Sequence, residues 1–98
     1  MKSKLYCIRD QKIGAFAQPF PGETEGAVLR GLKAAIDGGQ GDIAKYPTDF
    51  DLYELGEFDP ETGVITSNAI PRHVTNGGVF VEMKKLANQQ DNVQSISQ

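Results

Sequence analysis

The sequence predicts an α+β domain of order β-α-β-β, with one helix packed on a small three-stranded sheet that contains an antiparallel hairpin. Residues 2–9 alternate as a strand does, and residues 24–37 carry apolar side chains at helical spacing. Residues 51–66 form two extended segments around a turn that contains proline and glycine, which is typical of a hairpin. Residues 79–88 fit both a helix and a strand, and we favour a short C-terminal helix there.

The chain has 98 residues, enough for one domain with one modest core. We assign residues 1–87 to this domain and residues 88–98, rich in Gln, Asn and Ser, to a polar flexible tail. A compact chain of this length has a radius of gyration of about 13 Å. No apolar run reaches the length of a signal peptide or a membrane span, so we expect a cytoplasmic protein that does not contact a membrane.

The first strand is expected to be apolar on both faces. Leu5 and Cys7 point to one side of it, and Tyr6 and Ile8 point to the other. Such a strand is covered on two sides or meets a partner, and with so few large core residues we expect a homodimer. Cys7 is the only cysteine, so an intramolecular disulfide is excluded, and its neighbours indicate an inert thiol.

The next segments alternate between irregular chain and one well-marked helix. Residues 13–22 are expected to be irregular, because Pro19 and Pro21 interrupt regular structure. The helix over residues 24–37 ends at a glycine pair. One stripe along it collects its larger apolar side chains: Val28, Leu29, Leu32, Ala35 and Ile36.

The second half of the chain is predicted to be a hairpin between two connections. We expect residues 40–49 to be a loop and residues 67–78 to be a polar connection. The turn at residues 59–63 has proline where a type I turn accepts it and glycine where a positive φ is needed. A bulge at Gly56 would alter the register of the first arm.

No group of residues in the sequence predicts catalysis, a cofactor or a metal. His73 is the only histidine, without a second ligand at metal spacing or an oriented partner that spacing can identify, and we expect it on the surface. The densest chemistry is a run of carboxylates, which we expect to diverge into solvent along a strand edge. The members of this run are Asp49, Asp51, Glu54, Glu57, Asp59 and Glu61.

Basic residues near aromatic ones give the strongest binding hypothesis. Such mixtures hold single-stranded nucleic acid, because cations follow the phosphates and rings stack on bases. The candidate nucleic-acid-binding residues are Lys2, Lys4, Arg9, Lys12, Arg30 and Lys33. A net charge of −3 argues against bulk attraction to DNA, so these cations would have to share one surface. The alternative is that Tyr6 and Phe16 are core residues and the lysines only solubilise an edge.

Several strings resemble the small non-structural protein of gokushovirus-type microviruses, tailless phages with circular single-stranded DNA genomes. The resemblance extends over residues 4–72, and its strongest part is the string Phe50-Asp-Leu-Tyr-Glu-Leu-Gly-Glu-Phe-Asp59 with Gly63 after it. It also includes Leu5-Tyr-Cys-Ile-Arg-Asp10, Pro19-Phe20-Pro21 and Tyr46-Pro47.

The resemblance implies a non-enzymatic protein of the host cytoplasm. It would act late in infection on DNA, in the switch towards single-stranded genome synthesis and packaging into procapsids. The second hypothesis is an adaptor that recruits host replication enzymes or the procapsid through the acidic hairpin and an open sheet edge, without contacting DNA.

Overall fold

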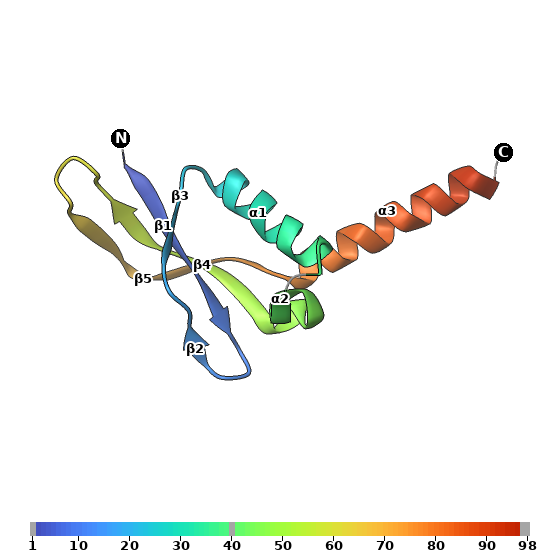
Figure 1. The fold of residues 1–98 in the computed structure, drawn as a ribbon, viewed down its shortest axis with the longest axis horizontal. Coiled ribbons are helices and arrows are strands. Elements are labelled where there is room, and N and C mark those ends of the chain that lie inside the picture. The colour runs from blue at the N-terminus through green and yellow to red at the C-terminus, as the bar shows by residue number, and fades with distance from the viewer. Residues whose placement is uncertain (1, 40, 97–98) are drawn as a thin grey trace.

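The computed structural model describes residues 2–39 and 41–96, with side chains described as far as Ala87 (Figure 1). In chain order the elements are β1 (Ser3–Asp10), β2 (Ala15–Phe16), β3 (Phe20–Gly22), α1 (Glu25–Asp37), α2 (Gly41–Lys45), the 3-10 turn η1 (Pro47–Asp49), β4 (Phe50–Phe58), β5 (Ile65–Asn76) and α3 (Gly78–Ile96).

The α+β class is confirmed, but the sheet has five strands where three were expected. Its order is β2-β1-β4-β5, every pairing is antiparallel, and β3 lies on the same side of β1 as β2. The expectation that residues 13–22 are irregular was wrong for β2 and β3, whereas residues 17–19 between them have no regular structure. Pro21 pairs opposite Leu5, and an outer strand accepts proline because its outward side needs no N–H donor.

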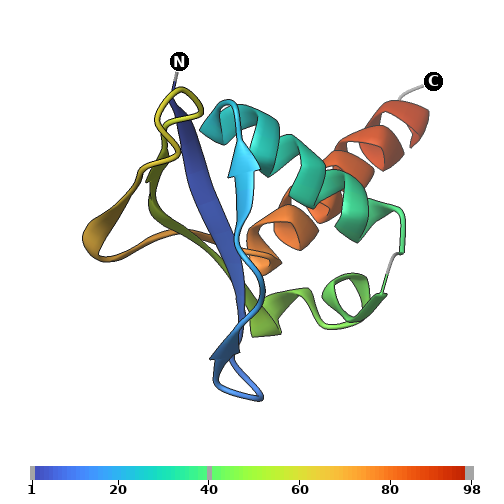
Figure 2. The ribbon, with the colours of Figure 1, turned by 60° about the vertical axis from the view of Figure 1, so that its left-hand side comes forward.

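Helix α1 has the face that its sequence predicts. Its five stripe residues are the least exposed of the helix, and Ile36 is the most buried of them. The helix begins at Glu25 because the Thr24 hydroxyl accepts a hydrogen bond from the Ala27 amide (3.1 Å). It ends where Gly38 caps it. The helix lies beside β3, against the sheet face that carries Tyr6, Ile8 and Leu52 (Figure 2).

The hairpin is confirmed and is longer than expected. Its turn closes through Gly63, whose φ of 76° favours glycine. The predicted irregularity is also present, because the register shifts between Glu54 and Gly56. A Cβ at Gly56 would lie 2.1 Å from the carbonyl oxygen of Thr66, so only glycine lets the strands approach this closely.

Two further expectations about connections were wrong. Residues 41–49 form α2 and η1 instead of a loop, and β5 extends through most of the expected polar connection to Asn76. Residues 68–71 of β5 have no register partner on β4, and Pro71 falls within them. Because Pro71 makes no ladder hydrogen bond, an outer strand with a local irregularity accommodates it.

The core is small and α3 extends away from it. Among the side chains that the structure describes, the apolar core consists of Tyr6, Cys7 and Leu52, which are fully buried, and of Ile36 and Phe80, which are 9% and 7% exposed. Residues 79–88 are helical, as favoured, and the helix continues to Ile96 (Figure 1). The radius of gyration is therefore 16.4 Å, above the compact expectation. The domain boundary at residue 87 stays a prediction, and residues 97–98 of the expected tail lie outside the described residues.

Replacing Gly56 by Ala should destabilise the fold, because the new methyl group would overlap the Thr66 carbonyl. We expect a loss of about 1–3 kcal/mol in the free energy of unfolding, measured by urea denaturation. The control is Gly26→Ala on α1, where the nearest atom to a new Cβ is 4.0 Å away, and it should leave stability unchanged or slightly raised. Equal midpoints for Gly56→Ala and the wild type would contradict the assignment.

Candidate nucleic-acid interface

A row of rings lies on the sheet face opposite α1. Tyr53 on β4 is in the middle, and its ring centroid is 5.3 Å from that of Phe16 and 5.3 Å from that of His73. Both contacts are edge-to-face, the favourable geometry for aromatic pairs. The three rings come from β2, β4 and β5, so the sheet order brings together residues that are far apart in the chain. We call Arg9, Phe16, Tyr53 and His73 the aromatic face.

Arg9 supplies the cation of the aromatic face. Its Cζ lies 5.8 Å from the centroid of the Phe16 ring, within cation–π range. The two residues are register partners across β1 and β2, which holds their side chains on the same side of the sheet. Phe16 is 47% exposed and the His73 side chain 50% exposed, whereas Tyr53 is half-buried between them. The face therefore offers accessible ring surface next to a guanidinium group.

A buried carboxylate holds His73 in place. Asp51 is 6% exposed, and its oxygens accept hydrogen bonds from Gln11 Nε2 (2.5 Å) and Asn76 Nδ2 (3.0 Å). The ring Nε2 of His73 lies 2.9 Å from Asp51 Oδ1. Burial would raise the pKa of Asp51, but the hydrogen bonds from Asn76, His73 and Gln11 outweigh it and hold the pKa below its ordinary value. The carboxylate is thus ionised and saturated with donors.

The α1 side of the sheet carries a separate ionic cluster. Glu54, 7% exposed, accepts hydrogen bonds from Arg72 Nη2 (3.1 Å) and Asn68 Nδ2 (2.9 Å), and these hold its pKa below the ordinary value. Arg72 also pairs with Glu25 at the start of α1. Lys4 also pairs with Glu54. Its pKa is raised, first by its hydrogen bond to Glu57 and then by the charge of Glu54. These charges are therefore neutralised within the protein and away from the aromatic face.

The structure does not bring the six sequence-predicted cations onto one surface. Lys4 is 3.3 Å from Glu57, and Lys33 is 2.6 Å from Asp37 on the next turn of α1. Lys12 lies in the β1–β2 loop, in a hollow lined also by Asp10, Asp42 and Asp49. Arg30 is exposed on α1, and Lys2 is exposed just before β1. Only Arg9 belongs to the aromatic face, and contact of the others with DNA stays a prediction.

Sequence reasoning missed Tyr53 and His73 as partners of Phe16. The hairpin register contains the signal, because Tyr53 and His73 are direct partners across β4 and β5. The second arm of the hairpin was expected to end near residue 66, so His73 was assigned to a connection and not to a paired strand. The same register places His73 beside Asp51, a partner that spacing alone did not identify.

The expected divergence of the acidic run into solvent was wrong for two of its members. Asp51 and Glu54 are buried, because each has side-chain donors within reach that replace water. Within residues 2–39 and 41–96, no three His, Cys, Asp or Glu residues are grouped so that they could hold a metal ion. Over the same residues no helix is both long and apolar enough to cross a membrane.

Cys7 is buried at 1% exposure, as expected of a thiol inside a sheet. Its Sγ donates to the carbonyl oxygen of Ala17 at 2.9 Å, which ties the segment after β2 to β1. Burial raises the pKa of this thiol, which keeps it protonated and unreactive at neutral pH.

The protein is a small α+β domain with exposed rings on one face of a curled sheet. Comparison with protein families places it among phage proteins. The chain belongs to the family described as Phage ORF5 protein, whose family model matches residues 3–80. The match ends in the first turn of α3 and includes all four residues of the aromatic face. No curated protein and no solved structure matches the chain.

Replacing Asp51 by Asn should make the melting temperature of the protein less dependent on pH in the acid range. A carboxylate whose pKa is lowered by folding stabilises the protein above its unfolded pKa of about 3.9, and this stabilisation is lost as the pH falls through the lower folded value. The wild-type melting temperature should therefore fall more steeply than that of Asp51→Asn between about pH 5 and pH 2.

The control for this experiment is added salt. Screening weakens interactions between exposed charges but acts much less on a buried, hydrogen-bonded carboxylate, so the difference between the two proteins should persist in high salt. Parallel melting profiles at every pH would show that Asp51 is not the group responsible.

Proposed function

We propose that this phage protein binds single-stranded DNA through the aromatic face and assists the switch to single-stranded genome synthesis and packaging in a gokushovirus-type microvirus. The observation that carries the proposal is the ring of Phe16, exposed to solvent, supported from the side by Tyr53 and overlaid by Arg9. An unpaired base could stack on such a ring while the guanidinium contacts the adjacent phosphate.

The net charge of −3 is compatible with this role because the two buried acids of the sheet are hydrogen-bonded within the protein. Glu54 is occupied by Arg72 and Lys4 on the α1 side, and Asp51 is saturated by its donors. A ligand that approaches the aromatic face therefore meets Arg9 and exposed rings before it meets an unpaired carboxylate. Stacking also contributes affinity that needs no excess of positive charge.

Family membership and the sequence resemblance support the biological part of the proposal. Such a protein would act by binding DNA as strands are displaced. It would do so in the host cytoplasm, together with procapsid or replication proteins. In infected cells, Phe16→Ala should lower the ratio of single-stranded to double-stranded phage DNA. An unchanged ratio would remove the genome-switch role even if DNA binding holds.

The adaptor hypothesis has one observation in its favour. The hairpin end exposes Val64 and Ile65, and Ile70 is 76% exposed in the unpaired part of β5. An outer strand with exposed apolar residues can pair with a partner's strand. A viral or host protein that stays bound after nuclease treatment, and is lost with Ile70→Ser, would favour this function over direct DNA contact.

Phe16→Ala should weaken binding to a fluorescent single-stranded oligonucleotide by about 5- to 150-fold, since one stacked base contributes about 1–3 kcal/mol. Arg9→Gln should also weaken binding and reduce the slope of log affinity against log salt by roughly 0.7, the value for one phosphate on a single strand. Both changes are measured by fluorescence anisotropy at low and moderate salt.

The matched controls are Tyr46→Ala and Lys33→Gln. Tyr46 is a ring of similar exposure (56% against 47% for Phe16) that is not part of the aromatic face, and Lys33 is a cation already paired with Asp37. Both should bind as the wild type does. Loss of binding in the controls but not in Phe16→Ala would place the DNA site elsewhere, and no binding at low salt would remove the DNA-binding proposal.

A further inference from the structure

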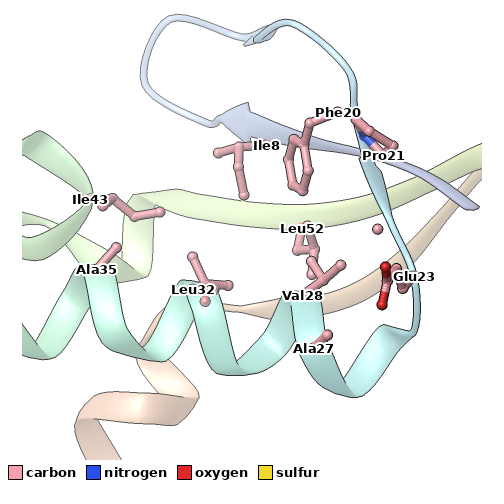
Figure 3. Close-up of a pocket in the computed structure, with 12 residues that line it drawn as sticks. Ile8, Phe20, Pro21, Glu23, Ala27, Val28, Leu32, Ala35, Ile43 and Leu52 are labelled. Carbon is pink, nitrogen blue, oxygen red and sulfur yellow. The ribbon is translucent and has the colours of Figure 1, made fainter.

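An apolar groove separates α1 from the strands that it covers. It has a volume of about 510 Å³, and Figure 3 shows its wall of side chains from α1 facing Ile8 and Leu52 of the sheet. Val28, Leu32 and Ala35, three of the five residues of the predicted stripe of α1, line the groove and are only partly buried. The helix was expected to pack on the sheet along this stripe, but in the monomer a groove stays open between them.

Helix α3 carries the complementary feature, an unpartnered apolar stripe. Val79, Met83 and Leu86 recur at helical spacing, and they are 48%, 53% and 59% exposed. The helix projects from the body of the molecule, so nothing in the described chain covers this side (Figure 1). An isolated helix in water gains little without a packed apolar face.

The exposed area of the chain is larger than that of a typical monomer of its mass. The accessible surface is 6869 Å², whereas a monomer of this mass typically exposes about 5,500 Å². The excess of about 1,400 Å² exceeds the roughly 800 Å² that each partner contributes to a standard interface. The groove and the α3 stripe both expose apolar side chains.

The residues of the α3 stripe do not line the groove of their own chain. Phe80, 7% exposed, anchors the first turn, and α3 contacts the body mainly at η1. Lys84, on the opposite side of the helix from the stripe, lies close enough to Asp37 at the end of α1 to join Lys33, the larger influence, in lowering the pKa of Asp37. After Gly78 the helix contains no glycine or proline at which it could fold back.

We propose that α3 of one copy docks its Val79–Met83–Leu86 stripe into the α1–sheet groove of a second copy, and that the exchange is reciprocal. Both halves of the contact are present on every chain, which is the requirement for an isologous twofold dimer. The occupant is apolar and helical, as the groove lining demands. This inference does not rest on DNA binding, and its test contains no DNA.

Light scattering on the full chain at tens of micromolar tests the assembly. The wild type should have twice the monomer mass of 10.6 kDa, and Met83→Gln with Leu86→Gln should return the monomer mass. Both residues are exposed in the isolated chain, so far-UV circular dichroism should show that the body stays folded. The control is Glu82→Gln with Lys85→Gln, which leaves the net charge and the stripe unchanged and should remain dimeric.

Cross-linking between chains identifies the occupant of the groove. One tagged protein carries Ala35→Cys in the groove, a second carries Met83→Cys on the stripe, and the mixture is treated with a short bismaleimide. Cys7 should not react because it is 1% exposed. We expect a covalent heterodimer that is absent when Leu86→Gln accompanies Met83→Cys.

Three results would overturn the proposal. A monomer mass for the wild type would exclude the dimer, and a dimer that survives Met83→Gln with Leu86→Gln would place the interface elsewhere. If one chain carrying both cysteines cross-links within itself at high dilution, the groove is filled by the chain's own α3 and not by a second copy.

Discussion

The register of β4 is the constraint on which the remaining structure depends. This strand is paired on both sides, and successive side chains on a strand point to opposite faces. Tyr53 is thereby fixed on the aromatic face, and Leu52 in the groove wall against α1. A slip by one residue would exchange these faces, placing the buried Leu52 in water and the Tyr53 ring against the helix. The close approach at Gly56 limits such slips, because only one position along β4 lacks a side chain where the carbonyl of Thr66 passes.

Charge is distributed by the same register. The two buried carboxylates, Asp51 and Glu54, lie on opposite faces of β4, and each is stabilised by donors from β5. Removing water from a carboxylate is costly unless hydrogen bonds replace it, so these contacts are a condition of folding as well as of surface chemistry. Because Glu54 is neutralised by Arg72 and Lys4 on the α1 side, an anionic chain can still present Arg9 and exposed rings on the other side.

The elements with strong local signals were predictable from the sequence. Helical spacing located α1 and its apolar stripe, and the proline and glycine of the turn located the hairpin. What sequence could not show depends on pairing over distance. The short strands of residues 13–22 exist because β1 offers an open edge, although Pro21 discourages regular structure locally. His73 joins the aromatic face only through its register with Tyr53, and the sequence does not show that Lys4 and Lys33 pair with nearby acids.

The groove and the aromatic face lie on opposite sides of one sheet, and this separates the two proposed interactions. Ile8 and Leu52 point into the groove, while Arg9 and Tyr53, their neighbours in sequence, point to the other side. Docking of a second α3 therefore leaves Phe16 accessible, and a reciprocal dimer presents two aromatic faces. Two linked weak sites bind one long strand more tightly than either alone, because the second contact forms at a high effective concentration. A single exposed ring with one guanidinium is a weak site, so the proposed dimer would add affinity to the proposed contact with DNA.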